Sequence, residues 1–400
     1  MLNGVLPRAR HMAPNPFMPQ MMTALIEPFR AISISRLAHA MKARGEKVIH
    51  MEFGQPSTGA PTKAIAAAHQ VLDTDGMGYW ESSPLKEALA GRYQDLYGVS
   101  VDPERIVLTC GASPALVMAL SSAFGPGDQI AFASPGYVAY RNTVKALHLE
   151  PLEIVCGEAT RFQISAAQIE ALERAPKGLI LASPANPTGT IIPAEELKAI
   201  ADVCARRNIR IISDEIYHGL SYVGRTHSML EFSSNALVVN SFSKYFSMSG
   251  WRLGWLVASD DLIDAARARM GNLFLTAPSL AQHAGLAAMD CIDELEANVA
   301  TYRTNREIVL RALPAMGVTR IAPPDGAFYI YANVSHLTQD SMAFAHQMLT
   351  DTGVAIAPGV DFDPVAGHTH LRFSFAVSTP QIEDAMSRLT PWFNNRSVLR

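Results

Sequence analysis

Long apolar runs are missing from this 400-residue chain, and without a hydrophobic stretch of about eighteen residues the sequence predicts no transmembrane helix. An excess of one charge is missing too, because 33 Lys and Arg stand against 37 Asp and Glu, a formal charge of −4 at pH 7. This balance gives no electrostatic reason to expect nucleic acid or a membrane surface as a partner. A hydrophobic content of 48% with a charged content of 18% also argues against a disordered chain.

Cysteine is scarce, and its spacing excludes two further classes of protein. The four cysteines lie far apart, without a CxxC pair or a Cys/His metal pattern: Cys110, Cys156, Cys204 and Cys291. The sequence therefore predicts neither a disulfide framework nor a metal site. We interpret the four thiols as small buried groups in a reducing compartment, and expect a cytoplasmic protein.

The length suggests about two domains, and the first is marked by strands alternating with helices. Six short apolar runs are expected to be strands: Arg105–Cys110, Gln129–Ala133, Gly178–Ser183, Ile209–Ser213, Ala236–Asn240 and Gly254–Ala258. Helical periodicity separates them, as in Pro193–Arg206, where Leu197, Ile200, Val203 and Cys204 form an apolar stripe. Such alternation predicts an α/β domain whose central sheet is mostly parallel and covered by helices.

The pattern changes after about residue 300. Helical stretches at Ser341–Thr350 and Thr379–Leu389 alternate with short strands at Phe328–Ala332, Gly353–Ala357 and His370–Phe375. We expect a smaller α+β domain here, with the helix Ile32–Arg44 packed onto it. The expected division is an N-terminal arm over 1–20, a small domain over 21–50 plus 300–400, and a large domain over 51–299. Residues 1–20 lack the apolar core of a secretory signal, and a functional arm and a plain tail both stay open.

One lysine stands where reactive side chains gather. Lys244 ends the segment Ser241-Phe242-Ser243-Lys244, directly after an apolar strand, and Arg252 follows eight residues later. A lysine in a partly desolvated cleft near other cations can lose its proton and attack a carbonyl carbon. The two hydroxyls and the guanidinium would suit a phosphate monoester beside it. Taken alone, a solvated surface lysine is the commoner outcome.

Three more segments end predicted strands. In Ser213–Tyr217, Asp214 can keep a ring nitrogen protonated and Tyr217 can bond an oxygen of the same ring, although Asp214 also suits a helix cap. Ser183–Gly189 contains Asn186 in what is otherwise ordinary turn chemistry. Thr109–Ser113 turns from strand to helix through small residues, which lets backbone N–H groups approach an anion.

Together these segments resemble the class I/II aminotransferase family of fold-type I pyridoxal-phosphate enzymes, the aspartate aminotransferase-like group. The resemblance runs from the turn Phe53-Gly54-Gln55-Pro56 to Leu371-Arg372-Phe373-Ser374. Its most specific part is a set of spacings: 28 residues from Asn186 to Asp214, three from Asp214 to Tyr217, eight from Lys244 to Arg252 and 128 from Lys244 to Arg372.

The resemblance implies pyridoxal 5′-phosphate as cofactor and a role for each matching residue. Lys244 would hold the cofactor as an imine and later act as acid and base, and Asp214 would pair with the ring nitrogen. Asn186 and Tyr217 would bond the phenolic oxygen. Residues of similar function around the phosphate and the ring face would be Ala112, Ser113, Ser241, Ser243, Arg252 and the stacking Tyr137.

For the substrate, the resemblance implies that Arg372 clamps the α-carboxylate, with Gly54 and Asn186 beside it. Tyr79 resembles a tyrosine that reaches the phosphate from a neighbouring subunit, which implies a homodimer. This segment departs from the family pattern, because only six residues separate Tyr79 from Leu85 and Lys86 stands where arginine is usual. That puts the role of Tyr79 in doubt.

The expected reaction is transfer of an amino group from an L-amino acid to a 2-oxo acid by a ping-pong mechanism. A carbon–sulfur lyase or related chemistry of the same imine stays open as the alternative, because all share removal of the α-proton. A cofactor-sensing regulator would need a basic DNA-binding extension, which this chain lacks before its family-like region. Side-chain specificity is open to acidic, aromatic and small neutral amino acids, and Tyr79, Trp80 and Met248 only hint at an apolar pocket.

Overall fold

A computed structural model gives the fold of residues 26–397. The expected arm over 1–20, and residues 21–25 of the expected small domain, lie outside the described residues. No helix within the described part of the chain is long and apolar enough to cross a membrane. All four cysteines are free; Cys156, Cys204 and Cys291 are buried and Cys110 is partly buried.

The larger of two sheets is mostly parallel, as the sequence predicted. Its strands are β2 (Ile106–Thr109), β3 (Gln129–Ser134), β4 (Glu150–Val155), β5 (Gly178–Ala182), β6 (Arg210–Asp214), β7 (Leu237–Ser241) and β8 (Gly254–Val257). They lie in the order β2-β8-β7-β6-β5-β3-β4. Strands β4, β3, β5, β6 and β7 run parallel, and β8 is antiparallel to both of its neighbours. All six strands expected in this region are confirmed within two residues at each end.

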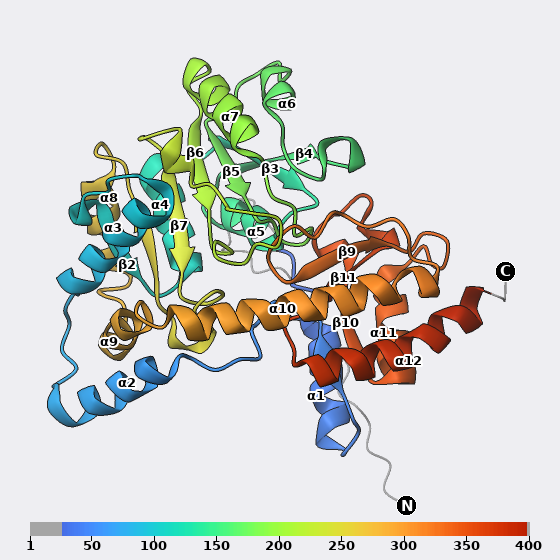
Figure 1. Cartoon of the computed structure of the whole chain (residues 1–400). Coiled ribbons are helices and arrows are strands. Elements are labelled where there is room, and N and C mark those ends of the chain that lie inside the picture. The colour runs from blue at the N-terminus through green and yellow to red at the C-terminus, as the bar shows by residue number, and fades with distance from the viewer. Residues whose placement is uncertain (1–25, 398–400) are drawn as a thin grey trace, which may run out of the picture.

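Helices cover both faces of this sheet (Figure 1). The described helices are α1 (Ala31–Ala43), α2 (Thr62–Thr74), α3 (Ser83–Tyr97), α4 (Ala112–Ala123), α5 (Val138–Ala146), α6 (Ala166–Glu170), α7 (Ala194–Arg206), α8 (Ile263–Leu273), α9 (Ser279–Ala288), α10 (Ile292–Ala312), α11 (Ser341–Thr352) and α12 (Thr379–Ser397). On one face, Ile180 and Ile212 pack with α4, α5 and α8. On the other, Leu179 and Ile211 pack with α3, α7 and α9. Burial on both faces explains why these strands are continuously apolar in sequence.

The smaller sheet joins the two ends of the chain. Its strands are β1 (Ile49–Met51), β9 (Tyr329–Asn333), β10 (Val354–Pro358) and β11 (His370–Ser374), in the order β1-β10-β11-β9. Strand β1 pairs in parallel with β10, and helix α1 packs on the same strand, as expected for a discontinuous unit. Helix α10 runs from beside α9 to the smaller sheet (Figure 1). The expected boundary at residue 299 falls inside α10, so the division into 51–299 and 300–400 stays a prediction.

The parallel strands bring the predicted functional segments to one edge. Asp214 is the last residue of β6 and pairs with Ala182 of β5 and Val239 of β7. Tyr137 follows β3, Asn186 follows β5 and Lys244 follows β7, each within a few residues. Since the carboxyl ends of parallel strands meet at the same edge, these side chains converge there.

Candidate active site

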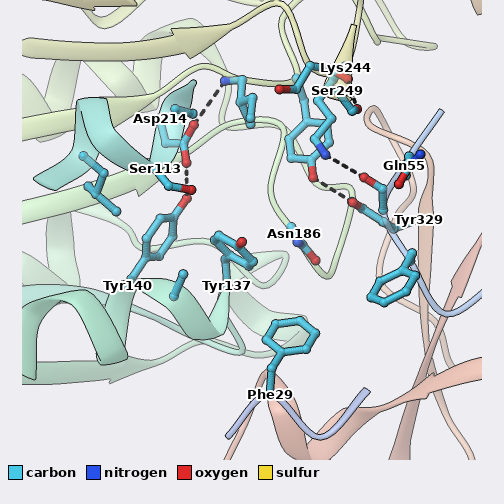
Figure 2. Close-up of a pocket in the computed structure, with 18 of the residues that line it drawn as sticks. Phe29, Gln55, Ser113, Tyr137, Tyr140, Asn186, Asp214, Lys244, Ser249 and Tyr329 are labelled. Atoms are coloured by element: carbon cyan, nitrogen blue, oxygen red, sulfur yellow. Dashed lines mark hydrogen bonds between the residues drawn. The ribbon is translucent and has the colours of Figure 1, made fainter. Parts of the chain in front are cut away.

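A cavity of about 400 Å³ opens at this edge, between the large sheet and the smaller one. Ten of the twelve expected cofactor and substrate residues apart from Lys244 line it: Gly54, Ala112, Ser113, Tyr137, Asn186, Asp214, Tyr217, Ser243, Arg252 and Arg372. Lys244 lines it too. Figure 2 shows Lys244 and Asp214 on one side of the cavity and Phe29 on the other. The cavity is thus built from segments far apart in sequence.

Lys244 reaches into this cavity from the turn that follows β7. Its Nζ donates to the backbone oxygen of Gly54 at 2.6 Å. Burial, with the nearby Arg372 guanidinium, lowers the pKa of Lys244 to about 8, against the opposing attraction of Asp214. A low dielectric and a like charge both disfavour the ammonium form. With a pKa of about 8, roughly a tenth of Lys244 is a neutral amine at pH 7, far more than at its ordinary pKa.

Asp214 is a buried carboxylate with two hydrogen-bond donors. Tyr140 donates to Oδ2 at 2.6 Å, and the backbone N–H of Ile216 donates to Oδ1 at 3.2 Å. Burial raises the pKa of Asp214, while both hydrogen bonds and the Lys244 charge lower it. The Ile216 contact is a local turn cap, and the residues after Asp214 form a turn instead of a helix. The Asp214 carboxylate lines the cavity and suits a cationic ligand atom.

An anion-binding corner lies where β2 turns into α4. Gly111, at φ +105°, precedes the helix, and a Cβ there would lie 2.4 Å from Nη2 of Arg252. Helix α4 has no side-chain cap, so the N–H groups at Ala112 and Ser113 begin the helix beside the Arg252 guanidinium. The positive end of a helix together with a guanidinium is a favourable place for a phosphate.

Ser243 and Ser241 differ in their positions relative to this corner. Ser243 lines the cavity, whereas Ser241 lies behind it. Ser241 Oγ accepts the backbone N–H of Ser243 at 2.9 Å and lies 3.0 Å from the oxygen of Leu253 and 2.7 Å from Oγ of Ser243. Ser241 therefore braces the turn that presents Ser243 and Lys244.

Arg372 is a buried cation at the opposite wall. It is 2% exposed and donates to Oδ1 of Asn186 at 3.0 Å and to the backbone oxygen of Glu52. Its guanidinium lies over the rings of Tyr329 and Phe362, 4.5 and 4.7 Å from their centroids. Nε has no hydrogen-bond partner among the described residues. An incoming carboxylate would supply the countercharge that this guanidinium needs.

Tyr217 and Tyr329 form a pair in the middle of the cavity. Their hydroxyl oxygens lie 2.7 Å apart, and both side chains are buried. Burial raises the pKa of Tyr217 well above its usual range, and that of Tyr329 to about 12, so both stay protonated. Gly54 makes room for this pair, because a Cβ there would lie only 1.6 Å from Oη of Tyr329.

The cavity of a single chain does not include three residues that the sequence singled out: Tyr79, Trp80 and Met248. Tyr79 is 83% exposed and lines a separate surface groove with Trp80. Met248 is fully buried and does not line the cavity. Lys86, the residue that departs from the family pattern, is buried and pairs with Glu104 at 3.0 Å. Its amine is therefore engaged at the base of α3, away from the cavity.

Sequence reasoning missed the cavity residues that carry no motif. Tyr140 and Tyr329 each contact an expected residue, and Ser249 Oγ donates to the backbone oxygen of Ser243 at 2.6 Å. Phe29 and Ile32 form an apolar part of the wall. Only Tyr140 had a usable signal, since it lies three residues after Tyr137, one helical turn along α5.

The arrangement fits pyridoxal 5′-phosphate on three observations of this chain. A lysine with a lowered pKa, a buried carboxylate and an anion-binding helix end all line one cavity. Their chemistry matches a carbonyl, a basic ring nitrogen and a phosphate, which are the three polar parts of this cofactor. Arg372 remains as a further cation in the same cavity and suits a substrate carboxylate.

Comparisons with known proteins agree with this geometry. The sequence profile of the family "Aminotransferase class I and II" matches residues 46–389. Valine–pyruvate aminotransferase of Mycobacterium tuberculosis is 43% identical, covering 93% of this chain and 97% of that one. A (5-formylfuran-3-yl)methyl phosphate transaminase of Methanocaldococcus jannaschii is 32% identical, covering 92% of this chain and 97% of that one. The crystal structure of an aminotransferase from Mycobacterium tuberculosis has a TM-score of 0.92 at 42% identity, and the match covers 94% of this chain and 100% of that one.

The fold and the cavity define an α/β enzyme of the aminotransferase fold, with its site at the carboxyl edge of a mostly parallel sheet. The chain belongs to the class I and II aminotransferase family. It is an aminotransferase, an enzyme that transfers an amino group to a 2-oxo acid. This confirms the expected function, and the lyase alternative has no support among these relatives.

Proposed function

We propose that this aminotransferase works with pyridoxal 5′-phosphate held covalently by Lys244, and exchanges amino and oxo groups in two half-reactions. The observation that carries the proposal is the lowered pKa of Lys244, about 8, in one cavity with Asp214 and Arg372. When bound, the cofactor supplies an electrophilic carbonyl and a ring that accepts electrons from the substrate α-carbon. Roughly a quarter of Lys244 would be neutral at pH 7.5, against about a thousandth at its ordinary pKa.

Lys244 has two tasks in this scheme. Its neutral amine would bond to the carbonyl carbon of the cofactor, whose oxygen leaves as water, because an unprotonated nitrogen is the nucleophile. Once substrate has displaced it, the same Nζ would take the proton from the substrate α-carbon and deliver it to C4′ of the cofactor, the former carbonyl carbon. The hydrogen bond from Nζ to the Gly54 oxygen holds the amine at the substrate side of the cavity.

Asp214 keeps the ring nitrogen protonated by its charge, while Tyr217 and Asn186 donate to the phenolic oxygen. Because Oδ1 of Asn186 accepts from Arg372, its amide NH₂ is the group that faces a ligand as donor. Tyr137 stacks on the ring. The phosphate is held by residues around the α4 end: the N–H groups at Ala112 and Ser113, the Ser243 hydroxyl braced by Ser241, and Arg252.

Arg372 binds the substrate α-carboxylate, and Gly54 allows the backbone to approach the same group. The amino acid and 2-oxo acid enter this position in turn. The Mycobacterium tuberculosis relative is a valine–pyruvate aminotransferase, so valine and pyruvate are the first pair to test.

We also propose a homodimer in which Tyr79 reaches the phosphate of the partner's site. Its 83% exposure in a single chain leaves the phenol available to another subunit. Four free thiols favour a reducing compartment, the cytoplasm.

The decisive experiment gives the purified enzyme an amino acid alone. The yellow cofactor should bleach with one equivalent of oxo acid released and no ammonia, and pyruvate or 2-oxoglutarate should restore the colour. Borohydride added beforehand should fix the cofactor to the peptide that contains Lys244. Sustained ammonia release without an acceptor would establish the lyase instead, and an adduct on another lysine would refute the assignment of Lys244.

A further inference from the structure

A short segment, Glu27–Ile32, lies at the solvent-exposed edge of the cavity, where Ile32 is 42% exposed, and is anchored on both sides. On the large-sheet side, Nδ2 of Asn142 in α5 donates to the Glu27 oxygen at 3.0 Å, and Lys145 lies 3.8 Å from the Glu27 carboxylate. On the small-sheet side, Asp361 caps the start of α1 by accepting from the backbone N–H groups of Arg30 and Ala31 at 2.8 and 2.7 Å. We call Glu27–Ile32 the mouth segment. Its two anchors fix where its apolar side chains lie.

The mouth segment presents Phe29 and Ile32 to the cavity. Both line it, and Figure 2 shows the Phe29 ring across the cavity from Lys244 and Asp214. Phe29 packs against the cluster that contains Phe362, whose ring lies under the Arg372 guanidinium at 4.7 Å. When Arg372 holds the α-carboxylate of a substrate, the substrate's side chain therefore begins close to Phe29 and Phe362. Phe53, which also lines the cavity, is 37% exposed and extends the apolar surface.

The charges around the cavity are already assigned to other groups. Among the described lining residues, the cations are Lys244, Arg252 and Arg372, and the acid is Asp214. Arg252 lies at the phosphate corner, where it also donates to the Cys110 and Ser249 oxygens. In the described part of a single chain, no cation that lines the cavity is left to neutralise a second carboxylate on a substrate side chain. A dicarboxylic amino acid would place that charge against Phe29 and Ile32, which costs desolvation without a partner.

We propose that Phe29 and Ile32, with Phe53, form the side-chain subsite, and that it selects amino acids with branched apolar side chains over dicarboxylic ones. This inference rests on the proposed function and adds a substrate class and the residues that set it. Burial of a valine-sized side chain against such a wall gives roughly ten- to hundredfold discrimination. Alanine, whose methyl group is too short to fill the subsite, serves as an internal reference.

The test measures single half-reactions of alanine, valine and aspartate by cofactor absorbance, in the wild type and three variants. The wild type should prefer valine to aspartate by about a hundredfold in kcat/KM. Phe29→Ala should lower kcat/KM for valine about tenfold and for alanine less than threefold, and Phe29→Leu should restore most of the valine rate. Ile32→Arg should narrow the valine-to-aspartate ratio at least tenfold, because it supplies the missing cation.

Ile292→Arg is the matched control, since Ile292 and Ile32 are both 42% exposed and Ile292 lies outside the cavity. It should leave the ratio unchanged. Equal losses for alanine and valine in Phe29→Ala, or a wild type that prefers aspartate, would overturn the subsite while leaving transamination intact. A wild type that converts no amino acid, alanine included, would refute the proposed function itself.

Discussion

The Tyr140 hydroxyl donates to Oδ2 of Asp214 at 2.6 Å, in a buried position at the wall of the cavity (Figure 2). Burial raises the pKa of Asp214, and the bond from Tyr140 is the largest of the effects that lower it. The Tyr140 hydroxyl therefore helps to keep the buried Asp214 carboxylate ionised, a task that water performs for an exposed carboxylate. Since the proposed task of Asp214 depends on its charge, Tyr140 acts on the chemistry through Asp214 as a positioning residue.

Tyr140→Phe should weaken this support while keeping the ring, which packs edge-on to Tyr137 with centroids 5.5 Å apart. Losing a hydrogen bond to a charged group costs about 1.5–3 kcal/mol, so the half-reaction should slow by roughly ten- to a hundredfold. The pKa of Asp214 should rise, which moves the acid limb of the pH–rate profile to higher pH. A slower enzyme with an unmoved acid limb would show that Tyr140 only fills space.

Asp214→Asn separates the charge of this residue from its role as a turn cap. Asparagine can still accept from the Ile216 N–H through its single amide oxygen, and its NH₂ group can donate to the Tyr140 hydroxyl instead of accepting from it. The apo protein should therefore melt within a few degrees of wild type. It carries no charge to hold the ring nitrogen protonated, and activity should fall by orders of magnitude. Thermal melts and single-turnover rates, measured on the same preparations of wild type and Asp214→Asn, compare the loss of stability with the loss of activity. Full activity would leave the cap as the sole function of Asp214.

The sequence could predict which strand ends carry the chemistry, because parallel strands bring their carboxyl ends to one edge. Asp214, Asn186 and Lys244 each follow an apolar run and need only that topology to meet. Strand β4 escaped prediction for a physical reason. As the edge strand it is half exposed and contains Pro151, so its residues show no apolar run.

The remainder of the site depends on side-chain directions that no local pattern encodes. Tyr329 is the second residue of the predicted strand Phe328–Ala332, yet its hydroxyl reaches Tyr217 only because Gly54 leaves the space vacant. Phe29 precedes a predicted helix, and its place at the cavity follows from the cap supplied by Asp361, 330 residues from Ala31. Contacts over such separations arise from tertiary packing and are visible only in the folded chain.

Glu215 gives a pH-dependent prediction that is independent of catalysis. Its Oε1 accepts from Met229 N–H, Ser228 Oγ and Ser213 Oγ at 2.9, 2.9 and 3.1 Å, and burial raises its pKa from 4.5 to about 8. Between pH 4.5 and 8 the folded protein keeps this proton and the unfolded chain loses it. The contribution of Glu215 to wild-type stability should therefore fall with rising pH in this window, by up to about 1.4 kcal/mol per pH unit, and level off above pH 8.

Glu215→Gln removes this titration and keeps an acceptor for the three donors. Its stability relative to wild type should grow from pH 5 to pH 8 and then stay constant. Urea unfolding of the two apo proteins at pH 5, 6.5, 8 and 9 measures the difference, in which the shared titrations cancel. Parallel curves across this range would show that Glu215 is ionised in the folded protein at neutral pH.

Tyr329 has two contacts that substitution can separate, its hydroxyl with Tyr217 and its ring with Arg372. Tyr217 has one proton, so if it donates to a cofactor oxygen, the hydrogen bond between the phenols must come from Tyr329. Tyr329→Phe should weaken Tyr217 as a donor and lower kcat about tenfold, while KM for amino acids stays within threefold. Tyr329→Leu also removes the ring under the guanidinium, a contact of about 0.5–2 kcal/mol, so its KM should rise a further two- to thirtyfold. Steady-state kinetics on both variants measure this split, and an equal rise in KM for the two would mean that the hydroxyl itself positions Arg372.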